Sequence, residues 1–141
     1  MSLESFCRKP LIKIEPDKTI TEACELMAQN NIGSLVVEQN GKLCGILTDR
    51  DIALRVAGTC KDAETTRVKD IMTPDPIRIS ADKDVPQLTA LMHAYHVRRV
   101  PIVNGLDTAL GIVTLDDLIA QLGVQMWQIG KAISEEFHGN A

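Results

Sequence analysis

The sequence has few aromatic residues and no long apolar run. Phe, Trp and Tyr make up 3% of its 141 residues, although hydrophobic residues as a whole make up 45%. A core of this composition must be aliphatic. No apolar stretch approaches the roughly 20 residues that a membrane-spanning helix needs. The first five residues also lack the basic and then apolar pattern of a signal peptide. We therefore expect a cytoplasmic protein of one domain, or of two small halves that share a core.

Positive charge and catalytic motifs are scarce as well. The formal net charge is −4, which argues against nucleic acid or an anionic membrane as the main partner. The sequence has no P-loop of the form Gly-x-x-x-x-Gly-Lys-Ser/Thr. It also has no Ser/His/Asp or Cys/His arrangement that it can bring together. An enzyme is therefore poorly supported, and we name no catalytic residues.

Metal-binding patterns are missing too. The four cysteines are widely separated and form no Cys-x-x-Cys pair, so a structural zinc site is not expected. Cys24 falls on an apolar helical stripe and Cys44 in an expected strand, which suggests small core residues. His93 and His96 could share a helix face, but no paired acidic or Cys ligand stands near them. We therefore predict no metal site.

What the sequence does contain is an internal repeat. Asp17-Lys18 recurs 65 positions later as Asp82-Lys83, and the same offset relates several apolar positions. After one inserted residue the offset becomes 66, and it relates the stretch of residues 45–51 to that of residues 111–117. Such a repeat is too long for chance. It divides the chain into a first unit (5–57), a linker (58–69), a second unit (70–123) and a C-terminal segment (124–141).

Each unit predicts the same order of elements. A short strand (11–14 or 77–79) leads to a helix whose start is marked by Thr19-x-x-Glu22 or Asp84-x-x-Gln87. A second strand (34–37 or 100–103), an Asn-Gly turn and a third strand (43–47 or 109–113) follow. A second helix comes last, and Gly58 is expected to end it in the first unit. A unit of about 50 residues buries too little surface to be stable alone, so the two should pack face to face.

The C-terminal segment predicts an amphipathic helix. Its apolar residues recur at intervals of three or four: Leu122, Met126, Ile129, Ile133 and Phe137. Because most helices are stabilised by packing their apolar face inward, we expect this helix to close the core of its own domain. A dimer contact is the alternative.

The two repeated stretches carry the candidate site. Each has a Thr and an Asp three residues apart, at Thr48 and Asp51 and at Thr114 and Asp117, where a strand ends and a helix begins. This spacing is typical of a capping box. The same geometry can bind ligands, because free N–H groups at a helix start attract anions and a carboxylate there can accept bonds from sugar hydroxyls. Two copies favour two binding sites over one acid–base pair.

Together these features resemble a tandem pair of cystathionine-β-synthase (CBS) domains, often called a Bateman module. The resemblance rests on the two Gly-x-x-Thr-x-x-Asp stretches, on residues 68–74 (Val-Lys-Asp-Ile-Met-Thr-Pro) and on the strand Val100-Pro101-Ile102-Val103. It covers nearly the whole chain and is closest to the stand-alone type. It implies an α/β fold of two β-α-β-β-α units, packed sheet to sheet with pseudo-two-fold symmetry. It also implies a homodimer, since such modules usually pair into a flat disc.

The resemblance further implies a regulatory adenine-nucleotide module with two clefts between its units. The ligands would be AMP, ADP or ATP, possibly S-adenosylmethionine or NADH, with no obligatory cofactor. In the family, the Thr contacts phosphate or ribose and the Asp takes the ribose hydroxyls, which assigns Thr48 and Asp51 to one cleft and Thr114 and Asp117 to the other. The opposite wall of the Asp51 cleft would be Thr73, Ile77, Arg78 and Val97. That of the Asp117 cleft would be Arg8, Ile12, Lys13 and Ile32.

The two clefts cannot be chemically equivalent. Arg8 stands where the second unit has Thr73, and Arg98-Arg99 stand where the first unit has Gly33-Ser34. Arg98 and Arg99 are either phosphate contacts or a solvated basic pair, and the sequence does not assign them to one cleft. Because Arg binds phosphate through a planar fork of donors, we expect ATP to favour the Asp117 cleft. The signal would pass through an unidentified partner protein or through the module's own dimer. A purely structural module with empty clefts is the alternative.

Overall fold

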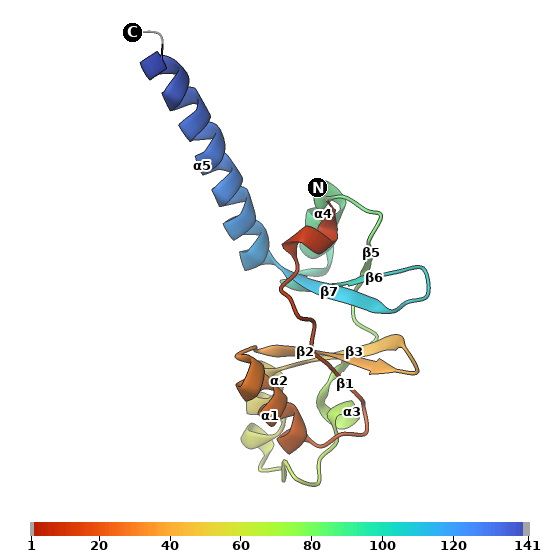
Figure 1. The fold of residues 1–141 in the computed structure, drawn as a ribbon. Helices are drawn as coiled ribbons and strands as arrows, with labels where there is room; N and C mark the ends of the chain where they lie inside the picture. Colours follow the sequence, from red (N-terminus) through yellow and green to blue (C-terminus); the bar gives the residue numbers. More distant parts are fainter. Residues whose placement is uncertain (1, 140–141) are drawn as a thin grey trace.

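The chain folds into two lobes whose sheets face each other, and a long helix projects from one of them (Figure 1). The computed structural model describes residues 2–139, and side chains over residues 2–136. Residues 140–141 of the expected C-terminal segment and the side chain of Phe137 lie outside the described residues. Lobe 1 has the sheet order β1-β2-β3-β4, and lobe 2 has the order β5-β6-β7. The predicted α/β fold of two β-α-β-β-α units with a C-terminal helix is therefore confirmed.

The element bounds follow the repeat. The strands of lobe 1 are β1 (Lys13–Ile14), β2 (Ser34–Gln39), β3 (Lys42–Thr48) and β4 (Thr73–Pro74). Those of lobe 2 are β5 (Ile79–Ser80), β6 (Arg99–Val103) and β7 (Ala109–Thr114). The helices are η1 (Leu3–Phe6), α1 (Ile20–Asn30), α2 (Asp49–Arg55), η2 (Ala57–Thr59), α3 (Val68–Ile71), α4 (Val85–Tyr95) and α5 (Leu115–Gly139). β1 is shorter than the expected 11–14, because only Lys13 and Ile14 pair with β2.

Local signals explain where the main helices begin and end. Thr19 and Glu22 form a complete capping box at the start of α1, and Asp84 and Gln87 form another at the start of α4. Both helices end on a residue in the left-handed conformation, Asn31 in α1 and His96 in α4.

The two sheets also share the same pattern of strand pairing. In each lobe the first strand is parallel to the second, the next pair is antiparallel, and β2 and β6 carry a register shift at matching positions.

Three apolar clusters hold the lobes together. Each lobe has its own core between sheet and helices. The third cluster lies between the two sheets and contains Val36 and Leu43 of lobe 1 and Val103 and Ala109 of lobe 2. These side chains lie on the face of each sheet that is opposite to the lobe's own core. They are therefore buried only because the two sheets pack against each other. The predicted face-to-face packing of the two units follows from this cluster.

The two lobes exchange segments. Leu3 and Phe6, at the start of the chain, are buried in the core of lobe 2. In return Val68 and Ile71 are buried in the core of lobe 1, and β4 joins its sheet beside β3. Lobe 2 therefore contains the segment that precedes the first repeat in the sequence, and lobe 1 contains the segment that precedes the second repeat. Neither lobe is complete without the other's chain segment.

Two glycines make room for the exchanged segments. A Cβ on Gly45 would lie 2.3 Å from Met72 Sδ, and one on Gly111 would lie 2.4 Å from Cys7 Sγ and 2.7 Å from Cys7 Cβ. Met72 follows α3 and Cys7 follows η1, so the same close approach occurs once in each lobe. The repeated glycine is thus needed because an exchanged segment lies directly on the strand.

Residues 58–69 lie against lobe 1. Ile20 and Thr21 at the start of α1 donate backbone hydrogen bonds to Thr66 and Ala63. The Lys69 ammonium is 2.9 Å from an Asp17 carboxylate oxygen and holds the pKa of Asp17 below its usual range. The expected helix end at Gly58 is wrong. α2 ends at Arg55 with Val56 as its C-cap, and Gly58 lies within η2, because the chain continues in a tighter turn.

The expectation that the C-terminal helix closes its own core is also wrong. α5 runs without a break from Leu115, and Leu118 is the last buried residue among those of its side chains that the structure describes. Beyond it, Leu122, Met126 and Ile133 are between 41% and 73% exposed. The helix continues because no proline interrupts it, and it leaves lobe 2 as a projecting stem (Figure 1). None of the described helices is long and apolar enough to cross a membrane.

Candidate functional site

The strand-to-helix junction of lobe 1 is a closed capping box. Thr48 ends β3 in an extended conformation, and its Oγ1 accepts the backbone N–H of Asp51 at 3.1 Å. The Asp51 carboxylate accepts the backbone N–H of Thr48 at 3.0 Å. Its other oxygen lies 3.8 Å from Arg55 Nη1, and this guanidinium donates to the carbonyl of Ile71. Asp51 is thus held by its own lobe.

The junction of lobe 2 is open by comparison. Thr114 Oγ1 accepts the backbone N–H of Asp117 at 3.0 Å, as in lobe 1. The Asp117 carboxylate, however, is contacted from the other end of the chain, because Arg8 Nε donates to its Oδ1 at 3.1 Å. Its Oδ2 is buried and has no hydrogen-bond partner among the described residues. Asp117 therefore retains an oxygen that can accept a bond.

One cleft lies beside each junction. The Asp51 cleft has a volume of about 330 Å³. Its lining is Ile46, Thr48, Thr73, Asp75, Pro76, Ile77, Val97, Arg98 and Arg99. Four predicted residues, Thr48, Thr73, Ile77 and Val97, therefore lie together there. Asp51 itself is bonded to Thr48 and is not among the lining residues.

The Asp117 cleft has a volume of about 190 Å³. Its lining is Arg8, Pro10, Leu11, Ile12, Ile32, Gly33, Ser34, Arg98, Arg99, Ile112, Thr114, Asp116 and Asp117. Five predicted residues, Arg8, Ile12, Ile32, Thr114 and Asp117, are among them. Asp116 was not predicted, although its place directly before Asp117 was a usable signal. Ser34 was missed because the repeat aligns it with Arg99 and so drew attention to the arginine alone.

Arg98 and Arg99 line both clefts. Arg98 Nη2 donates to Asp116 Oδ1 at 3.1 Å, and Arg99 Nη1 donates to Ser34 Oγ at 3.2 Å. Arg98 precedes β6 and Arg99 is its first residue, so both stand at the end of the strand that is next to the clefts. The sequence could not assign this pair to one cleft because it faces both.

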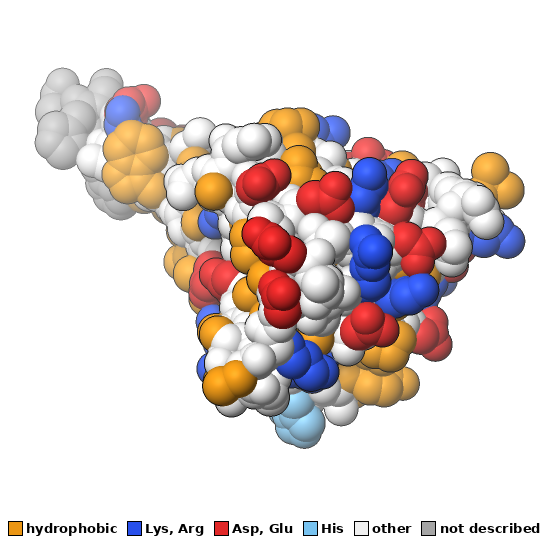
Figure 2. Space-filling model, turned by 90° about the horizontal axis from the view of Figure 1, so that it is seen from below, with side chains coloured by type: hydrophobic (Ala, Val, Ile, Leu, Met, Phe, Trp, Pro, Cys, Tyr) orange, Lys and Arg blue, Asp and Glu red, His pale blue; other side chains and the backbone are white. Residues whose placement is uncertain are grey.

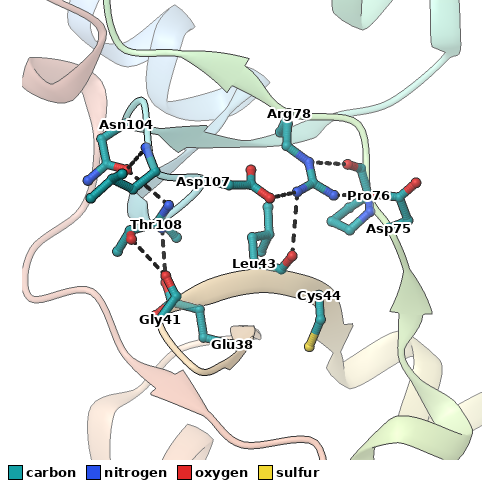
Figure 3. Close-up of polar contacts among 12 residues, drawn as sticks. Glu38, Gly41, Leu43, Cys44, Asp75, Pro76, Arg78, Asn104, Asp107 and Thr108 are labelled. Carbon is teal, nitrogen blue, oxygen red and sulfur yellow. Dashed lines mark hydrogen bonds and ion pairs between the residues drawn. The ribbon is translucent and has the colours of Figure 1, made fainter.

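Two of the predicted cations, Lys13 and Arg78, form ion pairs and are not among the residues that line the clefts. The Lys13 ammonium is 2.8 Å from Glu38 Oε2, and Lys13 does not line the Asp117 cleft. Arg78 does not line the Asp51 cleft either. Its Nη1 donates to Asp107 Oδ2 at 2.6 Å and to the carbonyl of Leu43, and it also pairs with Asp75 (Figure 3). Glu38, which pairs with Lys13, and Asp107, which pairs with Arg78, are both distant in sequence from their partners.

Arg78 belongs to a polar clasp between the two hairpin turns (Figure 3). Leu43 N–H donates to the carbonyl of Asp107 at 2.9 Å, and Thr108 Oγ1 donates to the carbonyl of Gly41 at 2.7 Å. Ala109 N–H donates to Glu38 Oε2 at 2.9 Å. The turns lie at the far end of the hairpins from Ser34, Thr48 and Thr114. The clasp therefore joins the lobes at the turn end of the hairpins, and the two clefts lie at the other end.

The cysteines and the two histidines with described side chains were the candidates for metal binding or reactivity. Burial raises the pKa of the Cys7 thiol to about 11, so it stays protonated and is a poor nucleophile at neutral pH. Cys44 packs against the core of lobe 1 as expected, but the core assignment of Cys24 is wrong, because its side chain is exposed. The rings of His93 and His96 stand edge to face, 6.3 Å apart. Among the described residues no group of three His, Cys, Asp or Glu side chains is placed to hold a metal ion.

The sequence pattern of the CBS domain family matches this chain twice, over residues 3–58 and 68–123. The chain belongs to the CBS-domain family. CBS domain-containing protein YhcV of Bacillus subtilis is 35% identical over 128 residues, which cover 90% of this chain and 89% of that protein. Inosine-5'-monophosphate dehydrogenase of Methanocaldococcus jannaschii is 36% identical over 79% of this chain, but the match spans only 21% of the enzyme. The similarity to the dehydrogenase is therefore confined to its CBS part.

Solved CBS-domain structures share the fold. An uncharacterised conserved protein from Pyrococcus horikoshii superposes with a TM-score of 0.75 at 26% identity, covering 85% of this chain and 90% of that one. The hexameric CBS-CP12 protein from bloom-forming cyanobacteria has a TM-score of 0.75 at 26% identity, covering 84% of this chain and 66% of that one. CBS modules generally bind adenosine ligands. Both clefts of this CBS pair are lined by residues of the two lobes.

Proposed function

We propose that this CBS-domain pair is a regulatory sensor of adenine nucleotides, with the Asp117 cleft as its stronger site. The observation that carries the proposal is the Asp117 carboxylate, which is 14% exposed, stands at a helix start and has one oxygen without a partner in the part of the chain that the structure describes. A buried acceptor without a donor is costly, and ribose hydroxyls are donors of the right kind. Binding a nucleoside there would satisfy the group.

The cations of this cleft support recognition of phosphate. Arg8, Arg98 and Arg99 all line it, whereas Lys13, expected there from the sequence, does not. The guanidinium groups of Arg8 and Arg98 are largely exposed, so they can turn to a ligand at little cost. Further phosphates need such partners, because unpaired negative charge is expensive to bury. We therefore expect ATP to bind more tightly than AMP in the Asp117 cleft.

Apolar walls support recognition of an adenine ring. Ile12, Ile32 and Ile112 line the Asp117 cleft, and Ile46, Ile77 and Val97 line the Asp51 cleft. Small-molecule sites typically combine such walls with a few convergent polar groups. Apolar walls select for the adenine ring and not for the group attached to the adenosine. ADP, S-adenosylmethionine and NADH therefore belong to the same candidate class. None of them is needed as an obligatory cofactor.

Signalling would pass through a homodimer or through an unidentified regulated protein in the cytoplasm. Assembly is a feature of the related CBS-CP12 protein, which is a hexamer. A second candidate is a purely structural module with empty clefts. It is favoured by the Asp51 junction, where the carboxylate is fully engaged in its own lobe.

Calorimetric titration with AMP, ADP, ATP, NADH and S-adenosylmethionine tests the proposal. Arg8→Thr gives the Asp117 cleft the residue that the Asp51 cleft has at the same position, Thr73. We expect it to weaken ATP several-fold and AMP less, since Arg8 is 72% exposed and its charge contact is worth about 1 kcal/mol or less. No binding by any of the five ligands would favour the structural module. Turnover of ATP in a product assay would indicate an enzyme instead.

A further inference from the structure

The Arg98-Arg99 pair lies close to the pseudo-two-fold axis that relates the lobes. Arg99 Nη1 donates to Ser34 Oγ at 3.2 Å, and Ser34 is the residue that the repeat aligns with Arg99, 65 positions earlier. Two residues that a two-fold axis exchanges can touch only beside that axis. The axis also exchanges the Thr48 and Thr114 junctions, so one cleft lies on each side of it. The pair therefore stands between the clefts and lines both of them.

The two clefts share this arginine pair because only lobe 2 supplies it. Lobe 1 has Gly and Ser at the equivalent positions 33–34. In the Asp51 cleft, the pair provides the only Lys or Arg side chains among the lining residues that the structure describes, and the acidic Asp75 lines this cleft as well. The Asp117 cleft has Arg8 in addition. Phosphate recognition in the Asp51 cleft therefore depends on the shared pair.

The side chains of the pair can turn to a ligand in either cleft. Both are exposed, and Arg98 contacts Asp116 at the surface, where an ion pair contributes little stability. The backbone of the pair is fixed, because Leu115 N–H at the start of α5 donates to the carbonyl of Arg98 at 2.8 Å. The position of the pair is thus set, while the direction of each guanidinium is adjustable.

We propose that the shared arginine pair couples the two clefts, so that a phosphorylated ligand in one weakens the binding of a phosphorylated ligand in the other. A guanidinium that binds one phosphate through its fork of donors is no longer available to a second. The second ligand must then bury its charge with fewer partners, which is costly. By thermodynamic linkage the effect is equal in both directions. This inference rests on the proposed function, because it requires nucleotides to enter both clefts.

Other basic side chains near the clefts have acidic partners. Lys13 and Arg78, which the resemblance placed in the clefts, are paired with Glu38 and Asp107. On the side of lobe 1 that Figure 2 shows, Lys and Arg side chains lie among Asp and Glu side chains. Among the described residues near the clefts, the pair is therefore the place where the phosphates of two ligands would compete.

The phosphates of the ligand determine the expected coupling. Adenosine has none, so two adenosine molecules should bind independently. ATP should show stronger coupling than AMP, because more of its charge must be matched. Added salt should reduce the coupling for ATP, because the competition is between exposed charges. Coupling of equal size for adenosine and ATP would overturn the role of the pair, since it would point to a change in packing instead.

Two matched variants allow the coupling to be measured by calorimetry on the full chain. Ile32 and Val97 are equivalent wall residues, one in each cleft. Ile32→Trp should obstruct the Asp117 cleft and leave the Asp51 cleft open, and Val97→Trp should do the reverse. For independent clefts, the overall constant for binding two ATP to the wild type equals the product of the constants of the two variants. We expect it to be smaller than that product by about fivefold or more, the lower end of the range for coupled sites, and to equal the product for adenosine.

The outcomes separate this inference from the proposed function. An overall constant equal to the product for ATP would overturn the coupling and leave nucleotide binding in place. One ATP bound by the wild type and none by Ile32→Trp would also overturn it, because the Asp51 cleft would then bind no nucleotide. One ATP bound by the wild type and one by each variant is the strongest form of the coupling. No binding of any ligand would remove the proposed function and the coupling together.

Ser34→Arg tests the pair without obstructing a cleft. It gives lobe 1 the cation that lobe 2 has at the same position, so the clefts no longer depend on one pair. The second ATP should bind several-fold more tightly than in the wild type, whereas the first ATP and adenosine should change less. Gln39→Arg, the same new charge at the other end of β2, should leave both ATP constants unchanged. An equal gain for the first and the second ATP would show only an effect of added charge and would overturn the proposal.

Discussion

Asp51 and Asp117 occupy the same place in the two lobes but have different partners. Asp51 is bonded to the backbone of Thr48 and lies near Arg55, so its contacts come from lobe 1 alone. Asp117 is contacted by Arg8 from a distant segment and keeps a buried oxygen free of partners among the described residues. Backbone symmetry therefore does not produce two equal sites. The side chains that approach each junction decide which carboxylate can still accept a ligand.

The same lesson holds at other matched positions. Gly45 and Gly111 both lie under an exchanged segment, yet one faces the flexible end of Met72 and the other faces Cys7, including its Cβ. Lys13 and Arg78 are also equivalent, yet one has a single carboxylate partner and the other joins three chain segments. Each pair allows a matched comparison, because the same substitution can be made at both equivalent positions of one protein.

The largest expected difference is between the two glycines. Gly111→Ala should destabilise the protein by about 3 kcal/mol, because Cys7 Cβ is fixed to the backbone and cannot move aside. Gly45→Ala should cost about 1 kcal/mol, because the Met72 thioether can rotate away. Urea denaturation of both variants measures the two losses.

Double mutants sharpen this comparison. Met72→Ala should partly offset Gly45→Ala, since it removes the two nearest side-chain atoms. Cys7→Ala removes Sγ but keeps the Cβ at 2.7 Å, so it should offset Gly111→Ala much less. Equal losses for the two glycines, or equal rescue, would show that the exchanged segments do not press on the strands as described.

The next expected effect is on ligand affinity. Asp117→Asn should weaken AMP binding by about 10- to 100-fold, since a charge-assisted hydrogen bond is worth about 1.5–3 kcal/mol. Asp51→Asn should change affinity much less and should instead lower stability, by about 1 kcal/mol, because its carboxylate completes a capping box. Calorimetry and thermal melts of the two variants separate these outcomes. Stronger loss of AMP affinity in Asp51→Asn would reverse our ranking of the clefts.

The smallest expected difference concerns Arg78 and Lys13. Arg78→Met should cost about 1–2 kcal/mol, because the Arg78 side chain is only 21% exposed and its loss leaves Asp107 and the Leu43 carbonyl short of a donor. Lys13→Met should cost about 0.5 kcal/mol, since it removes one ion pair at the edge of the sheet. Denaturant titrations measure both. If Arg78→Met lost nucleotide affinity at unchanged stability, Arg78 would belong to the cleft after all.

The sequence predicted what local patterns determine. Thr19-x-x-Glu22 and Asp84-x-x-Gln87 do start helices. The resemblance to the CBS family assigned Thr48, Thr73, Ile77 and Val97 to one cleft, and all four line it. Contacts between distant segments escaped prediction, because nothing near Arg78 in sequence indicates that Asp107 lies beside it. Ligand binding by these residues remains a prediction.

The exposed positions of Cys24 and of three apolar residues of α5, Leu122, Met126 and Ile133, were missed for a different reason. Helical spacing shows that apolar residues share a face, but it does not show that another element covers that face. For α5 the length of the uninterrupted helix was a usable signal, because a helix much longer than its lobe must leave it.

The exchange of segments has a consequence for synthesis on the ribosome. Leu3 and Phe6 are made more than 100 residues before Val113 and Leu118, which complete their places in the core of lobe 2. At about 5–20 residues per second, the nascent chain carries these apolar side chains unpaired for several seconds. Lobe 1 can close earlier, as soon as Ile71 and β4 have emerged. A fusion partner at the N-terminus would therefore disturb the lobe that is completed last, and not the lobe next to it in sequence.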